Sequence, residues 1–251
     1  MSALAWLARV GASPAEPLQL IMGCSERVAY DHVRRLEAAG LVRRVPMRRG
    51  DGSLIVLTRR GALAAGQPAT RALRSVGPSM WAHATACAWV SAWLQLRRRH
   101  WAGEREVLEH DFWRLELCYQ DHRGTVQQTH HPDLAVRVTN GLVAVEAELQ
   151  RKAARRQRGI CAMYKGLTDA HGPLLGVIYI TDRNDVSQLF ERTAAQVGLR
   201  EPELGFREMH TLVDQTYAAA DAHAAARAND LGNDATRIRQ LFVLLGGQHR
   251  R

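Results

Sequence analysis

At the start of the chain, apolar positions recur with the period of short helices. They have helical spacing from Ala3 to Val10, and a second short run covers residues 17–22. Ser25 is a favourable N-cap for a third helix that extends to Ala39, and Gly40 after it is a typical helix-ending glycine. The pattern therefore predicts three consecutive helices, the third of which has a strongly polar outer face.

The next apolar runs have the length and composition of strands. Residues 41–45 and 54–57 flank a basic, glycine-containing turn and predict a β-hairpin, and Thr58 opens another helix. Helices followed by such a hairpin resemble the winged helix-turn-helix domains of bacterial regulators, so we interpret residues 1–75 as a DNA-binding domain of this type. Two prolines and a Gly-Pro pair in residues 67–80 predict a linker after it.

The rest of the chain predicts a mixed-sheet domain flanked by helices, so the expected fold class is α/β (α+β) behind an N-terminal winged helix-turn-helix. The elements expected are a helix at 81–99, a hairpin at 133–148, a buried strand at 175–180 and a helix at 186–197. We assign residues 81–200 to this domain and residues 201–251 to a helical extension. Within the extension, helices are expected at 209–228 and 237–245.

The amino-acid composition excludes membrane proteins and secreted, disulfide-rich proteins and leaves the predicted fold unchanged. The chain has 251 residues, of which 46% are hydrophobic and 24% charged, which suits two globular domains with their own cores. No apolar run approaches the roughly 18–20 residues of a membrane span, and the N-terminus lacks the basic region of a signal peptide. The four cysteines have no C-x-x-C spacing. We therefore expect a cytoplasmic protein with reduced thiols and no membrane contact.

Positive charge is concentrated in the first domain. The net charge is +9, and residues 1–75 carry 12 arginines against 5 acidic residues. This asymmetry favours a polyanionic partner, which we expect to be double-stranded DNA. The alternative is a solvated basic face on a domain that binds protein. The residues expected to contact bases and phosphates are Arg27, Tyr30, Arg34 and Arg35 on the third helix and Arg48 and Arg49 on the wing.

The most informative stretch for chemistry surrounds Asn140-Gly141, a type I′ turn signal. With these two residues as the turn, Leu134 lies opposite Ala147 and every pair on that face of the hairpin is apolar. The other face then carries three carboxylates, with Asp133 opposite Glu148 and Glu146 two residues from Glu148. A turn shifted by one residue would instead pair Asp133 with Glu146, and the three carboxylates would still share one surface. A half-buried hairpin with one solvated polar face would show the same alternation.

Three carboxylates on one surface repel one another unless a cation lies between them. Oxygen ligands favour Mg²⁺ or Mn²⁺, and such an ion can polarise a phosphoryl group and activate a bound water. The hypothesis is that Asp133 and Glu146 are metal ligands and that Glu148 is either a third ligand or the base that orients the water.

This arrangement resembles the PD-(D/E)xK nuclease fold, through Pro132-Asp133, a hairpin and then Glu146-x-Glu148. Members of that fold usually have lysine where this chain has Glu148, although some active restriction enzymes have the E-x-E form. The resemblance implies that Lys152 supplies the missing cation and that an earlier helix adds an acidic metal ligand. Glu106 is the residue we expect in that place, with Glu104 as the alternative.

The order of motifs along the chain is similar to that of the replication-relaxation proteins, DNA-associated proteins of plasmids and other mobile elements. The motifs that carry this resemblance are the N-terminal winged helix, His83, Glu104-Arg-Glu106, His131-Pro-Asp133, Val145-Glu-Ala-Glu-Leu149 with Lys152, and the apolar strand at 175–180. His131 frames the motif in this pattern and is not a predicted ligand. The resemblance implies action on mobile-element DNA without fixing the reaction.

Two hypotheses follow. In the first, the protein is a Mg²⁺- or Mn²⁺-dependent DNA nuclease or nickase. In the second, it is a regulator or an accessory factor for replication or mobilisation, and its nuclease-like domain is inactive. Three carboxylates on one face favour the enzyme, whereas Glu148 in the place of lysine favours the accessory factor. A homodimer formed through the C-terminal helices is compatible with their composition, and no specific signal supports it.

Overall fold

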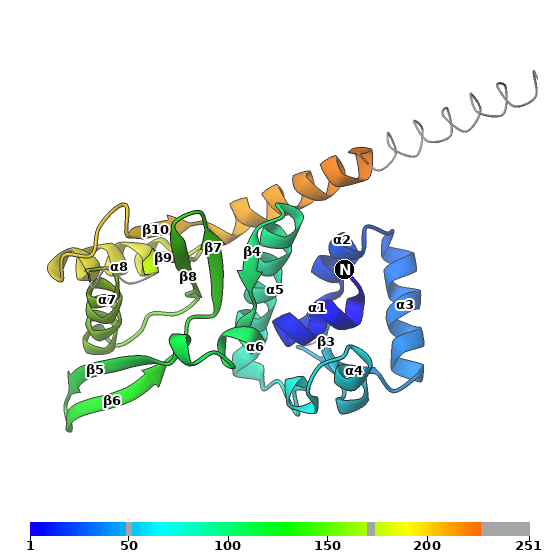
Figure 1. Ribbon diagram of the computed structural model, residues 1–251, viewed down its shortest axis with the longest axis horizontal. Helices are drawn as coiled ribbons and strands as arrows, with labels where there is room; N and C mark the ends of the chain where they lie inside the picture. Colours follow the sequence, from blue (N-terminus) through cyan, green and yellow to red (C-terminus); the bar gives the residue numbers. More distant parts are fainter. Residues whose placement is uncertain (49–51, 170–173, 227–251) are drawn as a thin grey trace, which may run out of the picture.

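The computed structural model describes residues 1–48, 52–169 and 174–226 (Figure 1). Its N-terminal part contains four helices and a small antiparallel sheet of strand order β1-β3-β2. The elements are α1 (Ala3–Val10), β1 (Ala12–Ser13), α2 (Ala15–Met22), α3 (Glu26–Ala38), β2 (Val42–Pro46), β3 (Ser53–Leu57) and α4 (Arg59–Ala64). The predicted helices and the predicted hairpin are confirmed, and β1 is an additional short strand that pairs with β3.

Local capping explains where the N-terminal helices begin and end. The Ser25 side chain accepts a hydrogen bond from the Val28 backbone amide at the start of α3, as expected. Gly40 follows α3 with φ +67°, a left-handed conformation that glycine adopts without strain. Thr58 links the end of the hairpin to the loop after α3, since its hydroxyl donates to the Gly40 carbonyl at 2.6 Å.

The second part is built on a mixed sheet flanked by helices, as predicted. The sheet has five strands in the order β10-β9-β8-β7-β4. Its strands are β4 (His100–Ala102), β7 (Leu134–Val138), β8 (Gly141–Ala147), β9 (Leu174–Ile180) and β10 (Leu204–Arg207). The β4–β7 and β7–β8 pairs are antiparallel, whereas β8–β9 and β9–β10 are parallel. Helix α5 (Trp81–Leu96) packs on one face, and α7 (Ala154–Asp169) and α8 (Asn184–Gln196) pack on the other.

The register of the β7–β8 hairpin differs from the prediction by two residues. Leu134 pairs with Val145 rather than with Ala147, because the turn lies on Thr139 and Asn140 instead of Asn140 and Gly141. A shift of two residues leaves every side chain on the face predicted for it, since side chains alternate with a period of two. The apolar face is confirmed, and it packs against α5 in the core.

A separate hairpin, β5 (Leu115–Asp121) and β6 (Gly124–His130), was not predicted. Its first strand alternates buried and exposed side chains, which is the signal that could have identified it. Helix α7 packs closely on β5 at Gly159, where a Cβ atom would lie 2.8 Å from the Tyr119 Cβ.

The N-terminal part and the sheet share one hydrophobic core. Trp6 of α1 contacts Trp101 of β4 edge to face with 5.8 Å between ring centroids, and the Arg9 guanidinium lies 3.8 Å from the Trp101 ring centroid. Arg71, in the predicted linker, is 9% exposed and donates hydrogen bonds to Glu109. The segment expected to be a linker therefore contains packed 3₁₀ turns at Ala69–Arg71 and Pro78–Met80.

Residues 209–226 form a helix that continues from the sheet along α5 (Figure 1). Trp89 of α5 contacts Tyr217 with 5.5 Å between ring centroids, and Leu212 joins the shared core. The helix predicted at 237–245 and the wing residue Arg49 lie outside the described residues. Within the described part of the chain, we find no helix with the length and hydropathy needed to span a membrane.

A substitution at Gly103 tests the contact between the N-terminal part and the sheet. A Cβ atom at Gly103 would lie 2.3 Å from the Arg9 carbonyl oxygen, a backbone atom that cannot move without displacing α1. We expect Gly103→Ala to lower the free energy of unfolding by about 1–3 kcal/mol, the usual cost of overpacking. Gly77→Ala is the matched control, because nothing lies within 4 Å of a Cβ there. Equal stability of both variants in chemical denaturation would contradict the packing described.

Candidate functional site

One pocket of about 370 Å³ collects the predicted acidic residues where β7 begins and β8 ends. The chain segments around it are the start of α5, the end of β6 and the loop between β8 and α7. Its polar lining comes from His83, His130, His131, Asp133, Glu146, Glu148, Gln150, Lys152 and Arg156. The hairpin therefore places all three predicted carboxylates around one cavity.

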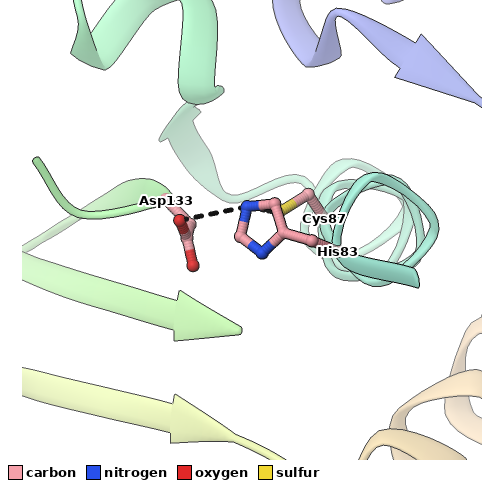
Figure 2. A group of neighbouring side chains, drawn as sticks. All are labelled: His83, Cys87 and Asp133. Atoms are coloured by element: carbon pink, nitrogen blue, oxygen red, sulfur yellow. Dashed lines mark hydrogen bonds and ion pairs between the residues drawn. The ribbon is translucent and has the colours of Figure 1, made fainter. Parts of the chain in front are cut away.

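Asp133 lies directly before β7 and contacts α5 (Figure 2). Its Oδ1 atom is 3.3 Å from Nε2 of His83, and its Oδ2 atom accepts a hydrogen bond of 2.7 Å from the Ala147 backbone amide. Both oxygens are thus held in a fixed orientation. The carboxylate connects the antiparallel hairpin with the helix that covers it.

Glu146 projects from β8 towards α7 and is 4% exposed. Its Oε1 atom accepts a hydrogen bond of 2.5 Å from the Tyr164 hydroxyl and lies 2.6 Å from Nε2 of His130. Burial, followed by the neighbouring Glu146 charge, raises the pKa of Tyr164 well above its ordinary value, so the phenol remains a donor. A buried carboxylate needs such partners to remain ionised.

Glu148 follows β8 and forms an ion pair with Lys152, four residues later along the chain. Both groups line the pocket, and Glu148 is 5% exposed. Burial is the main cause that lowers the pKa of Lys152, against the raising effect of Glu146 and Asp133. Lys152 thus lies beside Glu148 within the pocket.

The three carboxylates share the pocket, but each is held by its own partner. Of the chain that the structure describes, only His83, Cys87 and Asp133 bring three ligand atoms within 4.8 Å of one another. The set of Asp133, Glu146 and Glu148 does not meet that distance. A single ion bound by all three would therefore require their side chains to leave their present partners.

Glu106 does not lie in the pocket. Its Oε2 atom accepts hydrogen bonds of 2.9 Å from Arg9 and from the Gly103 backbone amide, so it holds α1 against the β4–α6 corner. Helix α6 spans Glu104–Val107. The alternative, Glu104, is near enough to the pocket residues to be affected by their charges. Burial is the main cause that raises the pKa of Glu104; the charge of His83 lowers this pKa and the charge of Asp133 raises it. The sequence therefore favoured the wrong one of the two acids. Residues two positions apart on a helix point in different directions, so only one of Glu104 and Glu106 can face the pocket residues.

His83 carries positive charge into the pocket. Its hydrogen bond to Asp133 is the largest effect on its pKa and outweighs burial, and the charges of Asp133, Glu104 and Glu146 act in the same direction. Together they raise the pKa of His83 to about 9. The imidazole is therefore protonated at neutral pH when no metal is bound.

The predicted DNA-contacting residues lie on the exposed surface of α3 and at the end of β2. In Figure 1, α3 lies at the edge of the N-terminal part farthest from α5. Tyr30 is 54% exposed, and the Arg44 guanidinium lies 4.7 Å from its ring centroid. Of the predicted set, Arg27, Tyr30, Arg34, Arg35 and Arg48 are exposed, and Arg49 lies outside the described residues.

Two residues at the site had no functional role in the sequence-based interpretation. These residues are Tyr164 and Cys87, and both are buried. Only the tertiary structure shows that the Tyr164 hydroxyl contacts Glu146 and that Cys87 contacts His83. The spacing of His83 and Cys87, which places them one helical turn apart on one face, is the signal that could have identified this pair.

Comparison with known proteins gives no assignment. No protein-family model and no curated protein matches the chain. Among solved structures, the crystal structure of protein VC1899 from Vibrio cholerae is similar at 16% sequence identity and a TM-score of 0.29. The match covers 88% of this chain and 50% of that one, so the chain spans about half the length of that protein. A TM-score this low carries no argument about function.

The raised pKa of His83 predicts a pH-dependent stability. The folded state binds this proton more tightly than the unfolded state, so the stabilisation is fully present below pH 6.5 and is lost as the pH rises through about 9. In chelator-treated protein, the stability advantage of the wild type over His83→Gln should fall by about 1–3 kcal/mol across that range. Denaturant titrations at several pH values measure it. His122→Gln, at an exposed turn, is the control and should show no such loss.

Proposed function

We propose that this protein binds double-stranded DNA through its N-terminal part. The observation that carries the proposal is the outer face of α3, where Arg27, Tyr30 and Arg34 are exposed at helical spacing. Such a helix fits the major groove, where arginine can donate to base edges and phosphates. Arg48, at the end of β2, is positioned to reach the neighbouring phosphate backbone.

The order of elements supports the same function. Helix α1, the short strand β1, helices α2 and α3, and the β2–β3 hairpin follow one another as in a winged helix-turn-helix domain. In that arrangement α3 is the recognition helix and the β2–β3 hairpin is the wing. The concentration of positive charge in residues 1–75 provides the long-range attraction to a polyanion.

We further propose that the sheet carries a DNA-cleaving site of the PD-(D/E)xK type. The proposal is supported by the mixed sheet, in which β4, β7 and β8 are antiparallel and α7 leads from β8 to the parallel strand β9. Asp133, directly before β7, and Glu146, in β8, would be its acidic residues. The pocket between them is lined by oxygen donors, which suits Mg²⁺ or Mn²⁺ in chemistry.

In this mechanism, Asp133 and Glu146 would hold the ion and Glu148 would orient the attacking water or join as a ligand. The ion supplies Lewis acidity towards the phosphoryl oxygens. Lys152 lies beside Glu148 and can stabilise negative charge that develops on phosphate. Tyr164 and His130 orient the Glu146 carboxylate from the side opposite to α5.

A second candidate function is favoured by one specific observation. All three carboxylates are already paired within the protein. Asp133 pairs with His83, Glu146 pairs with His130 and Tyr164, and Glu148 pairs with Lys152. A site neutralised in this way would suit a regulator or a replication or mobilisation factor of a mobile element, in which the nuclease-like domain is inactive. Cleavage assays separate the two functions, since both share DNA binding.

DNA binding by α3 is tested with the double variant Arg34→Ala plus Arg35→Ala. Loss of two phosphate contacts should lower the steepness of the salt dependence, d log K/d log[salt], by about 2, and should weaken binding at low salt at least about tenfold. Fluorescence anisotropy with duplex DNA across a salt series measures both. Arg192→Ala plus Arg200→Ala removes the same charge from exposed positions of the sheet domain and should leave the slope unchanged. Equal effects of the two double variants would refute the assignment of α3 to the groove.

Cleavage is tested on supercoiled plasmid with Mg²⁺ or Mn²⁺ added to chelator-treated protein. Under the nuclease hypothesis, Asp133→Asn and Glu146→Gln should each reduce nicking by roughly 100-fold or more, as expected for loss of a group that stabilises the transition state. Glu191→Gln, an exposed acid on α8, is the control and should cut normally. If the wild type does not cut but still shifts DNA, the accessory function remains.

A further inference from the structure

Three potential metal ligands converge on one point beside the pocket (Figure 2). His83 and Cys87 lie one turn apart on α5, and Asp133 approaches them from the segment before β7. The Nε2 atom of His83 is 3.5 Å from Sγ of Cys87 and 3.3 Å from Oδ1 of Asp133. All three ligand atoms lie within 4.8 Å of one another.

These separations match the edges of a tetrahedral zinc site. With Zn–N and Zn–O distances of about 2.0–2.1 Å and a Zn–S distance of about 2.3 Å, tetrahedral angles place N and O about 3.3 Å apart and N and S about 3.5 Å apart. The distances from His83 to Asp133 and to Cys87 are 3.3 and 3.5 Å. An ion could therefore bind His83 and its two neighbours with little movement of the backbone.

The donor set selects the class of metal. A thiolate and an imidazole favour zinc and similar transition metals, whereas Mg²⁺ and Mn²⁺ prefer oxygen donors alone. Cys87 is 2% exposed, and His83 and Asp133 line the solvent-accessible pocket above it. Three protein ligands leave the fourth coordination position open towards this pocket.

We propose that His83, Cys87 and Asp133 bind one Zn²⁺-class ion, which links α5 to the β7–β8 hairpin. The site is independent of the proposed DNA cleavage, although both involve Asp133. The surroundings favour a cation, because the buried carboxylates of Glu104 and Glu146 act electrostatically on His83. The hydrogen bond from the Ala147 amide to Oδ2 orients the Asp133 carboxylate so that Oδ1 faces the other two ligands.

Binding is balanced by release of protons. Cys87 loses its thiol proton to become a thiolate ligand, and the protonated His83 loses the proton on Nε2. At neutral pH the ion therefore displaces two protons into solution, and its apparent affinity rises with pH. The thiolate and the carboxylate together neutralise the charge of the ion.

Titration of chelator-treated full-length protein with Co²⁺ tests the site. We expect one equivalent of Co²⁺ to produce a thiolate-to-cobalt charge-transfer band and the visible bands of tetrahedral cobalt, and Zn²⁺ to abolish both by displacement. Cys87→Ser should lose the charge-transfer band. Cys118→Ser, at an exposed position on β5, should keep it.

Further variants test the same site in case Cys87→Ser does not fold. His83→Gln and Asp133→Asn should weaken Co²⁺ binding by more than 100-fold, beyond the roughly 10–100-fold cost of losing a group that only orients a ligand. Glu191→Gln, at an exposed position on α8 away from the pocket, should bind Co²⁺ normally. Circular dichroism checks that each variant is folded.

The proposal is overturned if the wild type gives no charge-transfer band, or if folded Cys87→Ser retains it. Neither result depends on DNA cleavage. If the protein nicks DNA with Mg²⁺ but does not bind cobalt, only the zinc-site proposal is refuted. If it binds cobalt but does not nick DNA, only the nuclease proposal is refuted.

Discussion

Burial of α5 from two sides is the constraint on which the rest of the structure depends. The helix is apolar around most of its circumference, and a helix of this kind must be covered on more than one face. Its buried residues are Ala84, Ala86, Cys87, Ala88, Trp89, Val90, Ser91, Ala92 and Leu94. The N-terminal helices cover one side and the sheet covers the other (Figure 1). The chain therefore forms one continuous body rather than two units joined by a flexible linker.

This arrangement joins the pocket and the basic surface through one shared core. DNA bound along α3 would be held in a fixed position relative to the pocket at Asp133, because Trp6 and Arg9 of the N-terminal part pack on Trp101 of the sheet. The buried acids are compatible with the fold because histidine, tyrosine and lysine donors compensate each of them.

The pocket and the cluster beside it offer two kinds of donor atom. The oxygens of Glu146 and Glu148 suit a hard cation, whereas Cys87 and His83 suit a softer one, and Asp133 lies between the two sets. Cys87 of α5 thus places a sulfur donor beside a group of carboxylates. The identity of the bound metal would decide which set Asp133 joins.

The sequence alone determined the local elements and the faces of the hairpin, because these follow from periods of 3.6 and 2 and from caps such as Ser25 and Gly40. It did not determine the exact turn, since a two-residue shift preserves the faces, nor which of Glu104 and Glu106 turns towards the pocket. Tertiary structure alone decided that His130, Tyr164 and Cys87 contact the site. Tyr164 and Cys87 are buried positions on helices distant in sequence from the hairpin, and His130 reaches Glu146 only because β6 ends beside β8. Such contacts depend on packing rather than on periodicity.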